Sequence, residues 1–229
     1  MSTPERISCT ELLDRSAWAA ALAPPECARV AAEIVQRTFA AGATVASKGA
    51  PVDAWIGVVD GLVKITSVSA EGKTVTFTGV PAGGWFGEGS LLKSEPRKYD
   101  VVALRDSRIA FMPRSTFQRL LDTSIAFNRH LLVQLNERLA QFIAKVEHDR
   151  LLGPEARVAR CVAELFNPVL YPGIGPRLAI SQEEVGYLSG FSRQRVNQAL
   201  GALEQAGLLR VEYGGIVVQD LDGLRRYVC

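Results

Sequence analysis

The chain has 229 residues, a length that accommodates two small domains, each with its own hydrophobic core. Apolar residues make up 48% of the sequence and charged residues 22%, proportions that exclude a disordered or fibrous protein. The net charge of +2 excludes a polycation, so any contact with nucleic acid must come from a local basic patch.

No segment is long and apolar enough to cross a bilayer, and residues 1–10 lack the pattern of a signal peptide. We therefore expect no membrane contact and a cytoplasmic location. The cysteines, Cys9, Cys27, Cys161 and Cys229, have neither metal-ligand nor redox spacing, which predicts reduced thiols. The two histidines both fall in one helical segment, which favours surface positions over a haem or metal site, and no metal site is expected.

Residues 9–40 are expected to form short helices, because their apolar residues recur at helical spacing between prolines. From about Ala41 the apolar period changes to two, and β-branched residues become frequent, as is typical of strands. Asp60-Gly61 and Glu71-Gly72 are hairpin signals between these strands. Short, hairpin-linked strands predict a small antiparallel roll or barrel.

Residues 81–90 contain four glycines, too many for a strand. Such glycines let backbone N–H groups point at an anion, or let a ligand approach the main chain closely. Residues 99–113 then predict two more strands around an Arg-Asp-Ser turn.

The longest helical pattern runs from about Phe117 to Leu152. Five of its apolar residues recur in alternating steps of three and four, the a/d spacing of a heptad repeat: Leu132, Leu135, Leu139, Phe142 and Val146. This seam favours pairing with the same helix of a second copy. The alternative is a helix packed on its own domain, and Leu131 and Ile143, off the seam, are expected to pack that way.

The polar residues between the seam positions, among them Gln134, Arg138 and Gln141, are expected to keep the opposite face of this helix in water. Gly153 and Pro154 end the helix and form the expected hinge to the rest of the chain.

Residues 180–209 fit a helix, a tight turn and a second helix. Ser181 with Glu184 three residues later predicts a capping box, Gly190 occupies the turn, and Ser192 caps the second helix. The outward face of the second helix carries side chains that read base edges or phosphates: Arg193, Gln194, Asn197 and Gln198. Two short strands that follow predict a wing. An ordinary helical hairpin is the alternative, but these features together favour DNA binding.

The order of these parts, from about Phe39 to Val218, resembles the cyclic-AMP receptor protein/Fnr (Crp/Fnr) family of bacterial transcription regulators. The resemblance is carried by Phe86-Gly87-Glu88 with Arg97, by the long helix and by the segment 180–209. It implies an α+β fold with an N-terminal antiparallel β-roll of the cyclic-nucleotide-binding (double-stranded β-helix or jelly-roll) type, a long dimerisation helix and a C-terminal winged helix-turn-helix domain.

The expected domains are residues 1–115, 116–152 and 153–229. The resemblance also implies a homodimer that binds a palindromic operator in double-stranded DNA. An activator would also need a surface that touches RNA polymerase, and the sequence does not locate one.

Gly87 and Glu88 resemble the family positions that hold the phosphate and a ribose hydroxyl of a cyclic nucleotide, and Arg97 resembles the arginine that pairs with the phosphate. This chain has Lys98 where the cyclic-AMP receptor has serine, and its loop is one residue shorter. The expected effector pocket comprises Gly87, Glu88, Gly89, Ser90, Arg97, Lys98, Phe142 and Ile143.

Phe142 and Ile143 fall where the receptor has two hydroxyl residues that contact adenine, and those hydrogen bonds cannot form here. The effector therefore remains open between cyclic AMP or another cyclic nucleotide, an unknown small molecule, and no ligand. In the last case Glu88 and Arg97 could form a structural ion pair.

In the second helix of the DNA-reading segment, Arg193 resembles the family arginine that reads guanine. Gln194 replaces the usual glutamate and Gln198 replaces a second arginine, so the base preference should differ from that of the receptor. Ser181 and Ser192 complete the expected DNA-binding residues.

Three other readings remain. Two of them keep the family but change the signal: a regulator that needs no effector, and a haem or redox sensor. The third is a ligand-binding module that acts on a protein partner. An enzyme is not expected, because the sequence has no nucleophile–base pair, no metal cluster and no P-loop ending.

Overall fold

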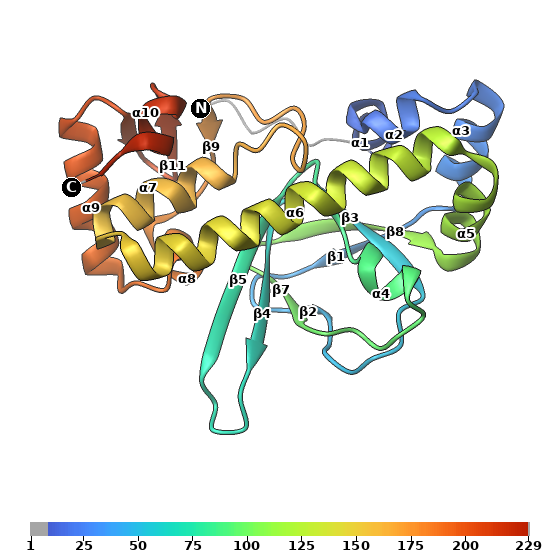
Figure 1. The fold of residues 1–229 in the computed structure, drawn as a ribbon, viewed down its shortest axis with the longest axis horizontal. Helices are drawn as coiled ribbons and strands as arrows, with labels where there is room; N and C mark the ends of the chain where they lie inside the picture. The colour runs from blue at the N-terminus through green and yellow to red at the C-terminus, as the bar shows by residue number, and fades with distance from the viewer. Residues whose placement is uncertain (1–8, 229) are drawn as a thin grey trace.

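The structure, a computed structural model, describes residues 9–228. They form an N-terminal β-roll, a long helix α6 (Ile125–Leu151) and a C-terminal helical domain with a small sheet (Figure 1). Helix α6 runs from the N-terminal helices at one end of the molecule to the C-terminal domain at the other. The α+β class predicted from the sequence is confirmed. Within residues 9–228 no helix is long and apolar enough to cross a membrane.

Two four-stranded antiparallel sheets build the roll. The first contains, in spatial order, β1 (Val35–Phe39), β8 (Ser107–Pro113), β3 (Ala54–Asp60) and β6 (Trp85–Phe86). The second contains β2 (Thr44–Ala46), β7 (Asp100–Ala103), β4 (Leu62–Val68) and β5 (Thr74–Pro81). Side chains from both sheets meet in one buried cluster, as alternating strands require: Ile56, Val58, Val63, Ile65, Val80, Phe86, Val101 and Ile109.

One of the two predicted hairpins is wrong. Strands β4 and β5 do pair around Gly72, but β3 and β4, which flank Gly61, belong to different sheets. Gly61 has φ +100°, a conformation that favours glycine, and turns the chain from one sheet into the other. A local turn signal marks the reversal of direction but does not say which strands pair across it.

In the part of the chain that the structure describes, three short helices precede the roll: α1 (Cys9–Arg15), α2 (Ala17–Ala20) and α3 (Pro24–Glu33). A proline begins α3, a position where its missing N–H costs no hydrogen bond. These helices bring Trp18 into an aromatic cluster in which its ring centroid lies 5.6 Å from that of Trp55, 5.4 Å from Trp85 and 5.7 Å from Phe127. Phe127 is the first buried residue of α6, so the cluster fixes the start of that helix on the roll.

The single long helix expected over residues 117–152 is two helices, α5 (Arg114–Thr123) and α6. The break falls at Ser124, which has an extended backbone and whose side chain accepts a hydrogen bond from the Phe127 amide at 3.2 Å. Serine competes for backbone N–H groups and therefore favours a helix start over a helix interior.

The expected solvated face of α6 is also wrong. Gln134, Arg138 and Gln141 are buried against the roll and hydrogen-bonded. Leu131 packs on its own domain as predicted, but Ile143 is 61% exposed and does not. The apolar face that remains exposed consists of Leu132, Val133, Leu139, Phe142, Ile143 and Val146, and Leu135 is partly buried.

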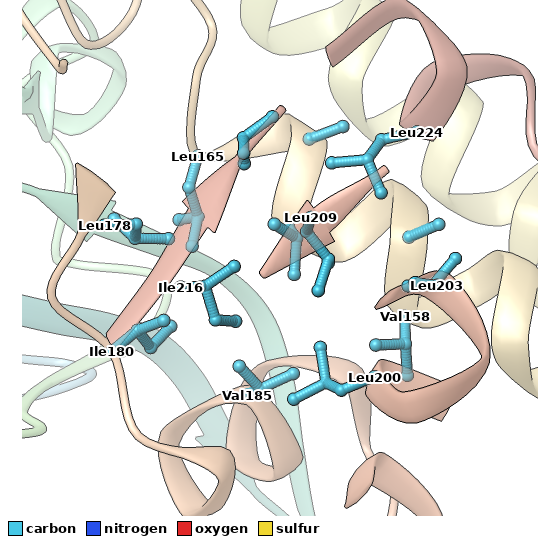
Figure 2. Close-up of a cluster of buried hydrophobic side chains, with 14 of the residues drawn as sticks. Val158, Leu165, Leu178, Ile180, Val185, Leu200, Leu203, Leu209, Ile216 and Leu224 are labelled. Atoms are coloured by element: carbon cyan, nitrogen blue, oxygen red, sulfur yellow. The ribbon is translucent and has the colours of Figure 1, made fainter. Parts of the chain in front are cut away.

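The C-terminal domain begins at α7 (Pro154–Glu164) and continues with the two helices of the predicted helix-turn-helix, α8 (Gln182–Ser189) and α9 (Arg193–Gln205). Strands β9 (Arg177–Leu178), β10 (Leu209–Glu212) and β11 (Gly215–Val218) form its sheet, and α10 (Leu221–Arg226) ends it. Figure 2 shows its apolar core, to which every helix and strand of the domain contributes: Val158, Leu165, Leu178, Ile180, Val185, Leu200, Leu203, Leu209, Ile216 and Leu224.

The C-terminal domain rests on the roll of its own chain. A Cβ atom on Gly79 of β5 would lie 2.9 Å from a methyl group of Leu188, so glycine lets α8 pack this closely. In the turn between β7 and β8, Arg105 donates to both carboxylate oxygens of Glu184 in α8, at 2.8 and 2.5 Å. This bidentate ion pair orients the helix-turn-helix on the roll.

Candidate effector loop and nucleic-acid interface

The loop between β6 and β7 brings the predicted anion-binding residues together. Gly87 has φ +93° and precedes the short helix α4 (Glu88–Leu92). A Cβ atom at this position would lie 3.1 Å from Arg97 Nη1, so the absence of a side chain lets the guanidinium approach the loop. Arg97 is only 5% exposed, and its Nη1 group is buried without a hydrogen-bond partner. An unpaired buried donor is costly, and an anion would satisfy it.

Glu88 is 4% exposed and accepts a hydrogen bond from Trp55 Nε1 at 3.3 Å. Within residues 9–228 no salt bridge joins Glu88 to Arg97, so these residues do not form the structural ion pair considered above. Tyr99 lies beside both: burial and the nearby Glu88 charge raise the pKa of its hydroxyl, and the Arg97 guanidinium is 5.9 Å from its ring centroid. The loop thus holds both charges in a buried, aromatic setting.

The other predicted pocket residues are placed differently. Ser90 is buried in α4 next to Gly89, but Lys98 is exposed and pairs with Glu95 at 3.2 Å. Phe142 lines a groove of about 620 Å³ between β5, α6 and α8, and Ile143 points outward. Phe142 and Ile143 are therefore not brought to the loop of their own chain.

Two α6 residues that the sequence reasoning left in solvent face the loop instead. Gln134 Nε2 and Arg138 Nη2 donate to the Trp85 carbonyl oxygen at 3.2 and 2.9 Å. Burial opposes the positive charge of Arg138, but Tyr171 and Glu88 raise its pKa above the ordinary value. The signal that could have found these two residues is their i, i+4 spacing on the face opposite the apolar seam.

The expected DNA-reading unit has the predicted caps. The Ser181 hydroxyl accepts from the Glu184 amide at 3.2 Å, and a Glu184 oxygen accepts from the Ser181 amide at 2.6 Å, which completes the capping box. Gly190 has φ +75°, and the Ser192 hydroxyl accepts from the Arg195 amide at 3.3 Å. These caps satisfy two backbone N–H groups at the start of α8 and one at the start of α9.

Helix α9 presents its polar face to solvent, and its buried positions face the domain core. Asn197 Oδ1 accepts from Gln182 Nε2 at 3.0 Å. Gly186 was not singled out from the sequence. A Cβ atom on it would lie 2.9 Å from the Phe191 carbonyl oxygen, so the glycine lets α8 pack closely against the turn. The four α9 residues predicted from the sequence are all exposed: Arg193, Gln194, Asn197 and Gln198. Arg195, Glu204 and Gln205 of the same helix are exposed as well.

The predicted wing is the β10–β11 hairpin, in which Gly214 has φ +70° and Tyr213 is fully exposed at the tip. A groove of about 350 Å³ lies between α8, α9 and this wing, and its lining includes Ser181, Arg193 and Tyr213. The arrangement is able to place side chains from a helix and a hairpin against one ligand.

Gly153 and Pro154 connect α6 to α7 with extended backbone at Gly153 and proline at the first position of α7. Around this connection the two helices enclose a polar cluster. Burial raises the pKa of Glu164 to about 7, and Glu164 Oε1 lies 4.0 Å from His148 Nδ1. Burial also raises the pKa of the Cys161 thiol to about 12, so Cys161 is a thiol and not a thiolate.

Cys27 and Cys161 are free thiols, whereas the Cys9 side chain and Cys229 lie outside the described structure. Among residues 9–228 no group of three His, Cys, Asp or Glu side chains is placed to hold a metal ion.

Two family models match the chain. The cyclic nucleotide-binding domain matches residues 36–124, and the Crp-like helix-turn-helix domain matches residues 137–227. The first match covers the roll with α5, and the second covers the end of α6 and the C-terminal domain.

Curated relatives match over most of their length. The transcriptional regulator SdrP of Thermus thermophilus is 30% identical over 192 residues, 82% of this chain and 91% of that protein. The cyclic AMP receptor protein of the same organism is 29% identical over 199 residues, 87% of this chain and 90% of that protein.

Among solved structures, FixK2 of Bradyrhizobium japonicum superposes with a TM-score of 0.69 at 19% identity, covering 86% of this chain and 98% of that one, and supports the fold alone. With both family models matched and a relative at this identity aligned over most of both proteins, the chain belongs to the Crp/Fnr family of DNA-binding transcription regulators.

Proposed function

We propose that this protein is a homodimeric regulator that reads a palindromic operator with α9 and responds to a small anionic effector held by the loop from Gly87 to Arg97. In this proposal residues 1–115 sense the effector, residues 116–152 pair the two copies and residues 153–229 bind DNA. Acting on operator DNA places the protein in the cytoplasm.

The exposed side of α9 supports the assignment of base-reading residues. Arg193 is the first residue of the helix, next to the Ser192 cap, where an exposed guanidinium can reach the floor of a major groove. Arginine pairs with guanine through two hydrogen bonds, and Asn197 and Gln198 can do the same with adenine.

The Arg193→Ala variant tests this assignment. We expect it to lose about 1–3 kcal/mol of specific binding and to tolerate any base at one operator position, measured by binding selection from a randomised duplex pool. Equal weakening on every sequence would instead make Arg193 a phosphate contact. The Arg226→Ala variant, which removes an exposed arginine of α10, is the matched control.

The apolar side of α6 supports homodimerisation. Leu132, Leu139, Ile143 and Val146 are all more than half exposed on a 27-residue helix, and they follow steps of seven, four and three. Such a stripe is unfavourable in water and is buried when two copies of the helix pair in parallel. The proposed contact surface differs from the predicted seam at two positions: it gains the exposed Ile143, which was expected to pack on its own domain, and Leu135, which is partly buried, lies at its edge.

A single observation carries the effector proposal: the buried, unpaired Nη1 group of Arg97 beside Gly87. A phosphate or another anion would accept from this group and from loop amides, and Glu88 would accept from a ligand hydroxyl. Cyclic nucleotides carry both groups and are the class to which the matched domain family points. With Arg138 and Gln134 near the loop, selectivity for the base need not follow the pattern of the cyclic-AMP receptor.

Tryptophan fluorescence tests the effector. Trp55 donates directly to Glu88, so a ligand that engages Glu88 alters the surroundings of the indole. We expect titration with cyclic AMP or cyclic GMP to shift the emission saturably in the wild type and not in Arg97→Gln. Lys93→Gln, which removes an exposed charge from the same loop, should respond like the wild type. No response to either nucleotide leaves a regulator of the same family with another effector or with none.

We place the moving joint at Gly153 and Pro154. An effector acts there only through different affinities for two domain arrangements, typically 1–3 kcal/mol of coupling. A disulfide engineered across this joint should abolish any effect of the effector on operator affinity, and an undiminished effect would move the joint elsewhere.

A further inference from the structure

The segment that follows α7 leaves the core of its own domain and enters that of the roll. We call residues 167–172 the strap. Leu170 and Tyr171 are 2% and 1% exposed, and both belong to the apolar cluster of the roll, together with Val80 and Phe86. Leu165, two residues before the strap, still belongs to the core of the C-terminal domain. The strap is therefore a second link between the domains, made by packing alone and separate from the covalent connection through α6.

The strap is held in one conformation by its own polar groups. Asn167 Oδ1 accepts from the amides of Val169 and Leu170 at 2.9 and 3.0 Å, which forms a tight turn. The Asn167 Nδ2 group donates to Glu137 Oε1 of α6 at 2.7 Å. The turn directs Tyr171 into the roll instead of into solvent.

Inside the roll, Tyr171 joins the effector loop through one arginine. The Tyr171 hydroxyl donates to the Gly79 carbonyl oxygen at 3.0 Å and accepts from Arg138 Nη1 at 3.1 Å. The other terminal nitrogen of Arg138 donates to the Trp85 carbonyl oxygen at 2.9 Å. Trp85 lies two residues before Gly87, so the path from the strap to the loop contains a single side chain.

The glycine-rich segment is shaped to admit the strap. A Cβ atom on Gly84 would lie 2.9 Å from Tyr171 Cδ1, and one on Gly83 would lie 2.8 Å from the Pro172 carbonyl oxygen. From the sequence, these glycines were expected to let backbone N–H groups point at an anion or to let a ligand approach the main chain. In the structure the group that approaches Gly83 and Gly84 is part of the chain itself.

We infer that the strap is an interdomain coupling device in which Tyr171, acting through Arg138, ties the position of the C-terminal domain to the conformation of residues 83–88. When the strap is packed in the roll, the helix-turn-helix is held on its own roll. When the loop rearranges, the Tyr171 ring loses its packing against Gly84 and the Tyr171 hydroxyl loses its hydrogen bonds. The inference extends the proposed function, because it names the positioning residue that links the proposed effector loop to the DNA-reading helices.

Hydrogen–deuterium exchange of the full chain, without DNA or nucleotide, tests the coupling. Tyr171→Phe removes the hydroxyl and keeps the ring. We expect exchange to rise roughly five- to tenfold both in residues 83–88 and in α8, because each lost hydrogen bond lowers the local opening free energy. Tyr187→Phe removes a hydroxyl that bonds only Glu183 within α8, and should leave residues 83–88 unchanged.

Gly84→Ala perturbs the same contact from the roll, because its methyl group would lie 2.5 Å from Val80 Cγ1 and 2.9 Å from Tyr171 Cδ1, so that both side chains must move. It should raise exchange in the strap and in α8, and the double variant should exceed neither single variant there. A rise confined to the strap, or an equal rise over the whole chain, would overturn the inference and leave Tyr171 with a packing role only. Because the exchange measurement uses neither nucleotide nor DNA, its result does not depend on the outcome of the nucleotide titration or of the operator selection.

Discussion

Glu164 is expected to make the stability of this protein depend on pH in a direction that is unusual for a carboxylate. Its side chain is 23% exposed between α6 and α7, and burial raises its pKa from 4.5 to about 7. The charged and titratable groups around it come from three helices: Lys145, His148 and Asp149 of α6, Arg160 of α7 and Arg225 of α10. Lys145 lowers the pKa and Asp149 raises it, but burial dominates.

The sign follows from proton linkage. Between pH 4.5 and about 7 the folded chain holds a proton on Glu164 that the unfolded chain has released, so its contribution to stability falls as the pH rises through this window. With these two pKa values the free energy of unfolding is about 2 kcal/mol higher near pH 5.5 than near pH 8. His148 works in the opposite direction, because burial lowers its pKa and the folded state is destabilised as the pH falls below about 6.5.

Urea unfolding of the wild type and of Glu164→Gln, followed by circular dichroism across this pH range, isolates the effect. The amide has the shape of the protonated acid and does not titrate, and His148 is common to both proteins and largely cancels in the difference. We expect the difference in unfolding free energy between the two proteins to change by about 2 kcal/mol between pH 5.5 and pH 8. A difference that stays constant with pH would refute the assignment of a raised pKa to Glu164.

Three further substitutions test other parts of the structure. Leu139→Glu should convert the proposed dimer to a monomer in sedimentation experiments because it places a charge in the α6 seam. Leu151→Glu, on an exposed residue of α6 off the heptad seam, should leave a dimer, and a dimeric Leu139→Glu would contradict the proposed interface. Gly61→Ala should lower the unfolding free energy by about 2 kcal/mol or more, because φ is +100° and the new Cβ would lie 2.8 Å from Ser107 Cα. Gly42→Ala should cost less, because φ is +81° there but no atom lies within 4 Å of the new Cβ. Equal losses would show that the backbone strain at positive φ, and not the contact with Ser107, sets the cost. Ser181→Ala removes one half of a capping box and should cost about 1 kcal/mol in thermal unfolding, and an unchanged melting temperature would mean that Glu184 caps α8 alone.

Periodicity and local capping signals were sufficient to predict most of the fold. The change of apolar period near Ala41 located most of the roll, and Ser181, Gly190 and Ser192 located the helix-turn-helix, because each of these signals acts on its own neighbours. Two strands were missed: β1 lies where helices were expected, and β6 lies in the glycine-rich segment that was not expected to form a strand. The hairpin predicted at Asp60-Gly61 was wrong because the same turn residues occur in hairpins and in corners between two sheets. The break at Ser124 was missed because apolar spacing continues across it.

The candidate site was harder to predict because its walls come from distant segments. Gly87, Glu88 and Arg97 were recognised from one loop, and the structure brings them together. Arg138 was assigned to water because polar residues on a helix usually are solvated, and only the packing of α6 on the roll shows that its guanidinium is buried. Tyr171, 33 residues further along the chain, bonds to it through tertiary contacts that no local pattern encodes.

The ion pair between Arg105 and Glu184 affects how the ionic strength dependence of DNA binding is to be interpreted. The Arg105 side chain is 31% exposed, so dissolved salt weakens its attraction to Glu184 as well as attraction to phosphates. Added salt therefore loosens the helix-turn-helix from its roll while it also reduces the gain from counterion release on the duplex. Because Glu184 also caps α8 through Ser181, the pair can open without unwinding that helix. The slope of log affinity against log salt then sums two equilibria, and the number of phosphate contacts is obtained from it only after an Arg105→Gln variant has been measured alongside.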